Sequence, residues 1–320
     1  MKPDQIQAAA DELLTAIHAT NKPANEVINA YTRARRYIGS KDRRALTDIV
    51  WKTIKNCPTP EWLKEYIPNE ELAAMNSQAH TILRINGNRK DIQKCLLDQG
   101  IESTFTKLSP IGLVLTKRTN LQTLSAYKNG LIEIQDEGSQ LAALATNIKP
   151  NDTVLDYCAG AGGKSLCFAQ MMQNKGEIVA HDISKISLLE LQKRAKRAHI
   201  TIIKATLKPI GTFDHVVVDA PCSGSGTWRR NPDARLKLTE KQLYALIKKQ
   251  SLILEKALPF VKKEGYLHYM TCSLIEQENQ GQIHNFLKHH KELRLIHHQQ
   301  WTPLKTNTDG FFLATFQKIK

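Results

Sequence analysis

From about residue 136 onward, short apolar segments alternate regularly with helical patterns, and this alternation constrains the fold more than any other feature of the chain. It predicts an α/β domain around a parallel sheet, because a crossover helix is needed between parallel strands. Val216, Val217 and Val218 are typical of a strand that is covered on both faces. We expect seven strands, at residues 153–156, 177–182, 201–204, 216–219, 265–270, 293–296 and 310–316.

Two smaller units are expected before this domain. Residues 1–75 carry apolar side chains at helical spacing, which predicts a helical domain. Residues 76–135 contain short strand-like segments and one helical pattern at 91–99, which predicts a small α+β module. The strand-like segments of this module are residues 80–87, 113–116 and 131–134. We therefore expect the α/β domain to occupy residues 136–320.

The chain is strongly basic. Its 320 residues include 45 Lys and Arg against 31 Asp and Glu, which gives a formal net charge of +14. This balance favours a polyanionic partner, and nucleic acid is the first candidate. The densest basic segment, Arg33–Arg44, is compatible with RNA contact or with a solvated helix face. In the segment Trp228–Arg230 the arginines are candidate phosphate contacts, and the indole is compatible with base stacking or with packing.

The cysteines and the apolar segments indicate where the protein works. None of the six cysteines forms a Cys-x-x-Cys pair, so we expect no metal site. The first residues lack the apolar core of a signal peptide, and no apolar run reaches transmembrane length. We therefore expect a cytoplasmic protein with reduced thiols, no membrane association and a monomeric state.

A glycine-rich turn follows the first strand of the large domain. Such a turn leaves backbone N–H groups free to hold a ligand, and Asp182 ends the next strand, where a carboxylate can bind ribose hydroxyls. A Walker loop would need glycine at Cys158, and a dinucleotide fingerprint would need glycine at Ser165. We therefore predict S-adenosyl-L-methionine as the cofactor, with a ligand-free turn as the alternative. The turn consists of Cys158, Ala159, Gly160, Ala161, Gly162, Gly163 and Lys164.

Two cysteines follow the fourth and fifth strands, Cys222 and Cys272. If these strands are neighbours about 4.8 Å apart, both thiols lie at one edge of the sheet, beside the glycine turn. Methylation of cytosine C5 needs a thiolate, because C5 becomes nucleophilic only after a nucleophile has added to C6. Asp219 is placed to act as the acid near N3. The alternatives are two structural cysteines or a disulfide, which a reducing compartment disfavours.

Four motifs together resemble the RNA cytosine-C5 methyltransferases of the Fmu/Sun/NSUN (RsmB-like) group. They are Gln135–Gln140, the Cys-Ala-x-x-Gly-Gly-Lys turn, Asp219–Gly224 and Thr271–Ser273, and the resemblance covers about residues 60–320. It implies a class I S-adenosylmethionine-dependent methyltransferase (Rossmann-like) domain preceded by an RNA-recognition-like module. The helical N-terminus resembles a NusB-like RNA-binding domain. The substrate implied is RNA, ribosomal RNA before transfer RNA.

The resemblance also assigns roles to the candidate site residues. It implies that Cys272 is the nucleophile and that Cys222 assists release of the methylated RNA. The glycine turn, Asp182 and Asp219 are implied to contact the cofactor or the target base. Cys222 remains the alternative nucleophile, because its Pro-Cys setting is similar to that of the DNA cytosine-C5 enzymes. An RNA-binding ribosome-assembly factor without activity is the alternative from another functional class.

Two departures from the family pattern concern the cofactor. Ala161 stands where the family often has proline, which should change the rigidity of the turn only slightly. The family usually has an aspartate after the third strand, and this chain has none there. Recognition of adenine is therefore expected from backbone groups or from Thr206.

Overall fold

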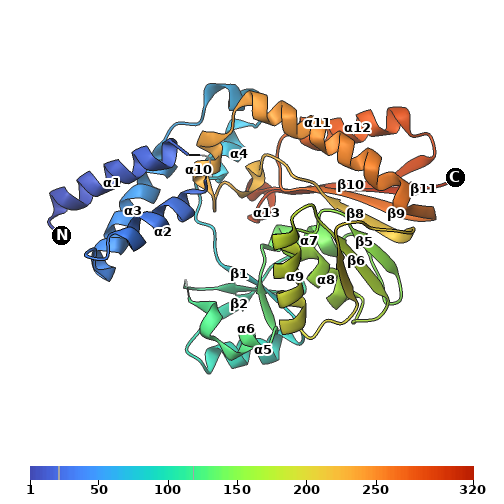
Figure 1. Ribbon diagram of the computed structural model, residues 1–320, viewed down its shortest axis with the longest axis horizontal. Coiled ribbons are helices and arrows are strands. Elements are labelled where there is room, and N and C mark those ends of the chain that lie inside the picture. Colours follow the sequence, from blue (N-terminus) through green and yellow to red (C-terminus); the bar gives the residue numbers. More distant parts are fainter. Residues whose placement is uncertain (21, 118) are drawn as a thin grey trace.

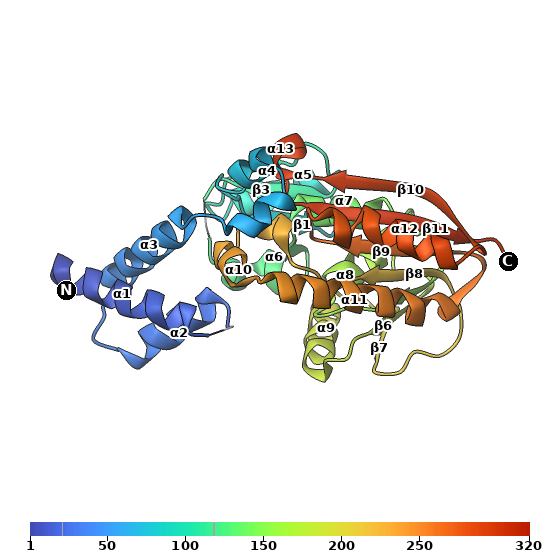
Figure 2. The same cartoon turned by 90° about the horizontal axis from the view of Figure 1, so that it is seen from above.

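The computed structural model describes residues 1–20, 22–117 and 119–320. Figure 1 shows a helical part, a small module and a larger α/β domain, and Figure 2 shows that α1–α3 project from the rest of the molecule. None of the helices in the described ranges is long and apolar enough to cross a membrane.

The N-terminal part is helical, as the spacing of its apolar residues predicts. Its helices pack around a core of their own that includes Leu13, Ile17, Leu46 and Val50, each at most 1% exposed. The helices are α1 (Pro3–His18), α2 (Ala24–Ala34) and α3 (Ser40–Asn56), followed by the turn η1 (Glu61–Glu65) and α4 (Asn69–Ala74).

The small module is a four-stranded antiparallel sheet in the order β2-β3-β1-β4. One face packs on the module's own helices, and the other face lies against the α/β domain. All four residues of β1 are buried, including Arg84, which donates to Gln135 and Gln170. The elements are β1 (Ile82–Ile85), α5 (Arg89–Leu97), β2 (Ser103–Phe105), β3 (Gly112–Leu115), η2 (Leu121–Thr123), α6 (Ser125–Lys128) and β4 (Ile132–Ile134).

The large domain is built on a seven-stranded sheet in the order β10-β11-β9-β8-β5-β6-β7. The five strands from β9 to β7 in this order pair in parallel, and β11 is antiparallel to both of its neighbours, β10 and β9. This confirms the predicted α/β class. The elements are α7 (Glu137–Leu144), β5 (Thr153–Asp156), α8 (Gly163–Met171), β6 (Glu177–His181), α9 (Lys185–Arg197), β7 (Ile203–Thr206), β8 (Phe213–Asp219), α10 (Pro232–Lys237), α11 (Glu240–Ala257), β9 (Val261–Thr271), α12 (Gln280–His289), β10 (Leu293–Trp301), α13 (Pro303–Thr306) and β11 (Phe311–Lys318).

Helices cover both faces of this sheet, and the three valines of β8 divide between the two cores. Val216 and Val218 pack on the side of α11 and α12, while Val217 packs on the side of α7 and α8. Successive side chains of a strand point to opposite faces, so a strand buried on both faces needs an unbroken apolar run. The prediction from the valine run, a strand covered on both faces, is therefore confirmed.

Some element boundaries differ from those expected. The third strand begins at Ile203 rather than Thr201, because the side chain of Asn174 binds Thr201 outside the ladder. The helix expected over 276–288 is interrupted at Asn279, whose side chain bonds Thr271 and the Ser273 carbonyl. Helix α10 and strand β2 are short elements that the sequence patterns did not indicate.

Candidate active site

The loops that follow β5, β6, β8 and β9 meet at one edge of the large sheet. This is the edge at which the carboxyl ends of the parallel strands lie, where ligands bind in open α/β sheets. Two cavities open there. One, of about 460 Å³, is lined by Cys158, Asp182 and Asp219 among others, and a second, of about 720 Å³, is lined by Cys222.

The structure brings the two candidate thiols together. Strands β8 and β9 are parallel neighbours with Asp219 opposite Met270, and Cys222 Sγ lies 3.3 Å from Cys272 Sγ. Both cysteines are free and half-buried. The hydrogen bond to Cys272 and burial raise the pKa of Cys222 well above its ordinary value, so Cys222 holds its proton at neutral pH. The Cys222 thiol therefore carries a proton beside the sulfur of Cys272.

A buried carboxylate holds the two cysteine loops in place. Glu278 is fully buried and accepts hydrogen bonds from the backbone N–H and the hydroxyl of Ser223, from Ser273 and from Gln250. Ser223 follows Cys222 and Ser273 follows Cys272, so one carboxylate ties both loops to helix α11. The break in the helix at Asn279 is what allows Glu278 to turn inward.

The glycine-rich turn has the backbone geometry of a ligand cradle. Gly160 and Gly162 adopt left-handed backbone angles, with φ of 52° and 84°. A Cβ on Gly162 would lie 2.5 Å from Leu191 Cγ, whereas one on Gly160 or Gly163 would meet open space. Asp182 accepts from the N–H groups of Gly160 and Ser184, each at 2.8 Å, so its carboxylate is oriented toward the turn.

Lys164 points into the protein and orients Asp219. Its ammonium lies 2.5 Å from Asp219 Oδ2 and 5.1 Å from the centre of the Phe311 ring. Burial lowers the pKa of Lys164, but the attraction of Asp219 outweighs that effect, and the pKa is raised above its usual value. The lysine therefore stays charged in the resting protein, and Asp219 lies at the site in an ion pair with it.

Asp156 lies beneath the turn and was not among the residues predicted from the sequence. It is fully buried, one oxygen accepts from Ser165 Oγ at 2.6 Å, and the other, Oδ1, has no protein partner in the described structure. Burial raises its pKa to about 7. A buried carboxylate oxygen without a partner, next to a glycine cradle, suits a cofactor with a cationic amino-acid end.

We expect the stability of an Asp156→Asn variant to depend on pH differently from that of the parent. The folded state keeps a proton on Asp156 up to about pH 7, whereas the unfolded chain loses it near pH 4. Between pH 4 and pH 7 Asp156 therefore ionises only in the unfolded chain, and this lowers the stability of the parent progressively, by on the order of 4 kcal/mol. Thermal unfolding should show the variant close to the parent at pH 4 and more stable at pH 8. A constant difference across this range would contradict the assignment.

Thr206 has a different setting from the other predicted cofactor residues. It ends β7, and its hydroxyl bonds the backbone N–H and carbonyl of Lys208, both at 3.1 Å. The lining of the 460 Å³ cavity includes Cys158, Asp182 and Asp219 but does not include Thr206. Next to Asp182, the side chain of Ile183 is 84% exposed and lines this cavity as an apolar wall.

The structure places Trp228–Arg230 in contacts within the fold, and for Trp228 it confirms the packing alternative. Trp228 is 1% exposed and packs against Leu63 and Ile67, so its ring is closed to stacking on a base. Arg229 is buried against Asp309, and Arg230 pairs with Asp136 and Asp309. These side chains join the large domain to the linker before the small module, because Arg230 also donates to the His80 carbonyl.

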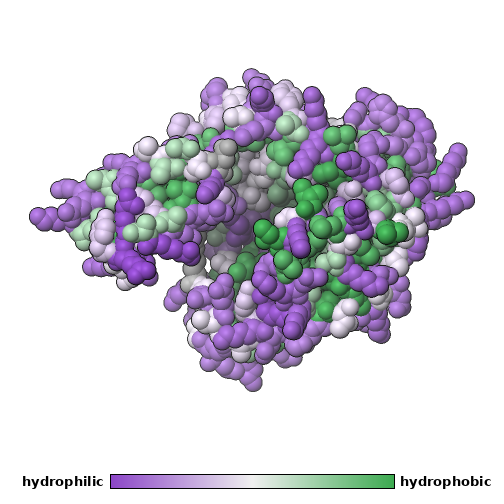
Figure 3. Space-filling view, viewed as in Figure 1, coloured by the Kyte–Doolittle hydropathy of each residue, from purple (hydrophilic) through white to green (hydrophobic). Residues whose placement is uncertain are grey.

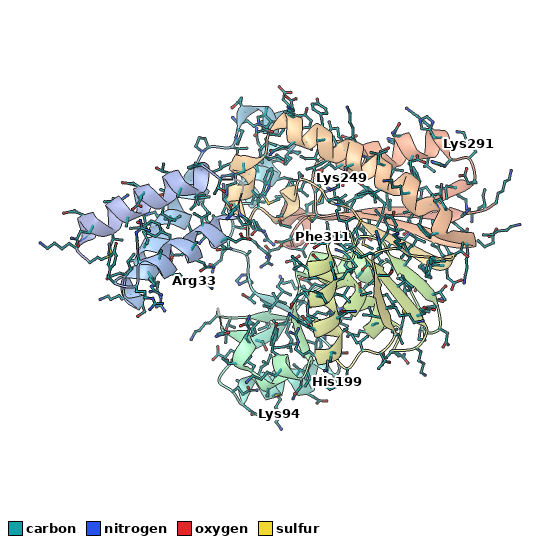
Figure 4. The ribbon with its side chains drawn as sticks, viewed as in Figure 1. Arg33, Lys94, His199, Lys249, Lys291 and Phe311 are labelled. Atoms are coloured by element: carbon teal, nitrogen blue, oxygen red, sulfur yellow. The ribbon has the colours of Figure 1, made fainter. Side chains whose placement is uncertain are left out.

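The basic segment Arg33–Arg44 lies at the end of the helical part away from the thiols. Figure 4 labels Arg33 there, far from Lys249 and Phe311 of the large domain. Arg35 pairs with Glu12 and stacks on Tyr31, whereas Arg33, Arg36 and Arg44 are exposed. RNA contact by this segment stays a prediction.

Sequence reasoning missed Asp156 and Glu278. For Asp156 a usable signal existed, since a lone carboxylate ends an apolar strand directly before the glycine turn. For Glu278 the sequence carries no comparable signal, because its role depends on a helix break and on contacts with residues about 55 positions away.

The chain is similar to known proteins in its sequence. The family model described as 16S rRNA methyltransferase RsmB/F matches residues 143–317. A relative in Bacillus subtilis (strain 168), described as a probable ribosomal RNA small subunit methyltransferase B, is 34% identical over 91% of this chain and 73% of its own length.

Two solved structures show the same fold. A methyltransferase homolog protein from Pyrococcus horikoshii is 26% identical, with a TM-score of 0.68 over 78% of this chain and 90% of that one. The crystal structure of NSun6 from Pyrococcus horikoshii with SFG is 20% identical, with a TM-score of 0.74 over 81% of this chain and 97% of that one.

Proposed function

Because the chain belongs to the 16S rRNA methyltransferase RsmB/F family, we propose that it methylates carbon 5 of a cytosine in ribosomal RNA, with S-adenosylmethionine as methyl donor. The observation that carries the choice of cytosine C5 is the 3.3 Å contact between Cys222 and Cys272, beside Asp219 and the glycine cradle. Methylation of an exocyclic amine or a hydroxyl would need no thiol.

The residues at the sheet edge fit this cofactor. The open positions at Gly160 and Gly163 leave room for it against the turn, Asp182 can bind its ribose hydroxyls, and Asp156 can face its ammonium. When bound, the cofactor supplies an electrophilic methyl group on a sulfonium centre. The solved NSun6 structure with SFG shares this fold and gives the proposal a structural precedent.

Cys272 acts first in the proposed reaction. Its thiolate adds to C6 of the cytosine, the C6–S bond forms, and the electron pair displaced from the C5–C6 double bond gives C5 its nucleophilic character. Asp219 faces N3 and relays to it a proton from the Lys164 ammonium, which stabilises the adduct, and N3 returns this proton when the C6–S bond breaks. The 720 Å³ cavity, which Cys222 lines, is the entry for the base in this proposal.

Cys222 acts after methyl transfer. The C5 proton must leave so that the electron pair can reform the C5–C6 double bond and expel the Cys272 thiolate. Part of the rise in the pKa of Cys222 comes from its hydrogen bond to Cys272. Alkylation of Cys272 weakens that bond, so Cys222 loses its proton to solvent more readily once the adduct exists. The resulting Cys222 thiolate can then accept the proton from C5.

The proposal is tested by cofactor binding and by mapping the product. We expect S-adenosylmethionine to bind with a micromolar Kd in calorimetry and, at about 100 times Kd, to stabilise the fold by about 2.7 kcal/mol. Bisulfite sequencing of small-subunit ribosomal RNA from a deletion strain should show one cytosine that has lost its protection, and the wild-type gene should restore it. Binding of NAD or ATP in place of S-adenosylmethionine, or unchanged protection in the deletion strain, would contradict the proposal.

A further inference from the structure

One lysine stands where the two cavities of the active site meet. Of the residues that the structure describes, Lys249 alone lines both the 460 Å³ cavity with Asp182 and Asp219 and the 720 Å³ cavity with Cys222. Figure 4 labels it along α11, on the side toward the sheet, and Figure 3 shows apolar side chains gathered over the same part of this face. A cation in this position reaches the space of the cofactor and the space of the target nucleotide.

The backbone at this lysine is held firmly although its side chain is exposed. The next residue, Gln250, is fully buried and donates to the Pro221 carbonyl at 3.1 Å and to Glu278 at 2.8 Å. Pro221 directly precedes Cys222. Helix α11 is therefore hydrogen-bonded to the cysteine loop at this turn, and the backbone of Lys249 keeps a fixed position relative to the thiols.

Within the described structure the ammonium of Lys249 has no ion-pair partner, and the same holds for Lys256, which lines only the 460 Å³ cavity. Asp219 pairs with Lys164, and the other lysine of the larger cavity, Lys237, binds Asp233 and the Lys22 carbonyl. The charge of Lys249 nevertheless acts on the site. Burial and three carboxylates raise the pKa of the Cys158 thiol, and Lys249 opposes that rise.

We propose that Lys249 binds an oxyanion of the bound substrates at the junction of the two cavities. This inference rests on the proposed function and deepens it. Two ligands could supply this oxyanion, and an ammonium would bind both in the same way. They are the carboxylate of S-adenosylmethionine and a phosphate of the target nucleotide. Both ligands carry an anion next to the reacting groups, and a positioned ammonium is a strong partner for either.

The test compares Lys249→Met with Lys248→Met, its neighbour on the same helix. Lys248 is also exposed, lies outside the lining of both cavities and carries the same charge, so it controls for the loss of one positive charge. Lys249→Arg should retain most of the binding, because it keeps the charge. Neither lysine is placed in the bond-making steps, so the readout is binding.

Two arms distinguish the sources of the anion. If Lys249 holds the carboxylate, Lys249→Met should weaken S-adenosylmethionine binding about tenfold and leave the binding of 5′-methylthioadenosine, which lacks the carboxylate, unchanged. If it holds a phosphate, the variant should weaken binding of a cytosine-containing oligoribonucleotide about tenfold and reduce the slope of log K against log salt by about 0.7.

Either arm on its own supports the proposal. Equal behaviour of Lys249→Met and Lys248→Met in both arms overturns it while leaving the proposed function intact. Failure of the wild-type protein to bind both S-adenosylmethionine and the RNA overturns the proposed function as well as the inference.

Discussion

A Cys272→Ala variant is expected to lose methylation of its RNA by about 10⁴-fold or more, because no other group in the proposed reaction can add to C6. The side chain is small and half-buried, so the variant should remain folded and should still bind S-adenosylmethionine. Transfer of a radiolabelled methyl group to RNA and calorimetric binding of the cofactor measure the two properties separately.

The matched control is Cys95→Ala. Cys95 is another half-buried free thiol, but it lies on α5 of the small module. This variant should retain full activity. Activity in Cys272→Ala close to that of Cys95→Ala would show that Cys272 is structural.

A Cys222→Ala variant is expected to stop at a later step and to accumulate covalent protein–RNA complex. Cys272 can still attack and the methyl group can still transfer, but the C5 proton has no base at the position of Cys222. Turnover should fall by about 10²–10⁴-fold, the range for loss of a positioned general base. The complex should survive a denaturing gel, and it should be absent when both cysteines are replaced.

The reverse pattern would exchange the roles of the two thiols. A complex that accumulates with Cys272→Ala and disappears with Cys222→Ala would make Cys222 the nucleophile. Full activity in both single variants would remove the thiols from the chemistry.

The sheet and the thiol pair could be predicted because they follow from local patterns. A run of three valines needs apolar surroundings on both faces, and two cysteines placed just after neighbouring parallel strands must lie at the same edge. The structure accordingly places β8 beside β9 and the two sulfurs 3.3 Å apart. These features could be predicted because each depends on the residues of a single strand and of the loop that follows it.

Other features depend on contacts between loops that are distant in the sequence, and sequence patterns do not show which loops meet. Arg229 and Arg230 are basic residues of a basic protein, yet both are used against Asp309 within the fold. Trp228 is aromatic and follows the catalytic loop, yet it fills the core beside Leu63. The same loop sequence would be compatible with an exposed, RNA-binding conformation if those partners lay elsewhere.

The electrostatics of the site are a third part that sequence reasoning could not reach. Motif matching places Asp219 near the target base, but only the fold shows that Lys164 already neutralises it. Likewise, the raised pKa of Asp156 comes from its complete burial, which depends on how α8 packs over β5. These effects set protonation states, and they can be read only once side chains have positions.

The most direct test of the central claim is to incubate the wild-type enzyme and S-adenosylmethionine with RNA that carries 5-fluorocytosine at the target position. Fluorine at C5 cannot leave as a proton does, so the reaction should stop with the enzyme bonded to C6 and C5 methylated. Digestion and mass spectrometry should then find the modified nucleotide on the peptide that contains Cys272. A nucleotide attached to Cys222, or methylated RNA with no covalent complex, would contradict the account.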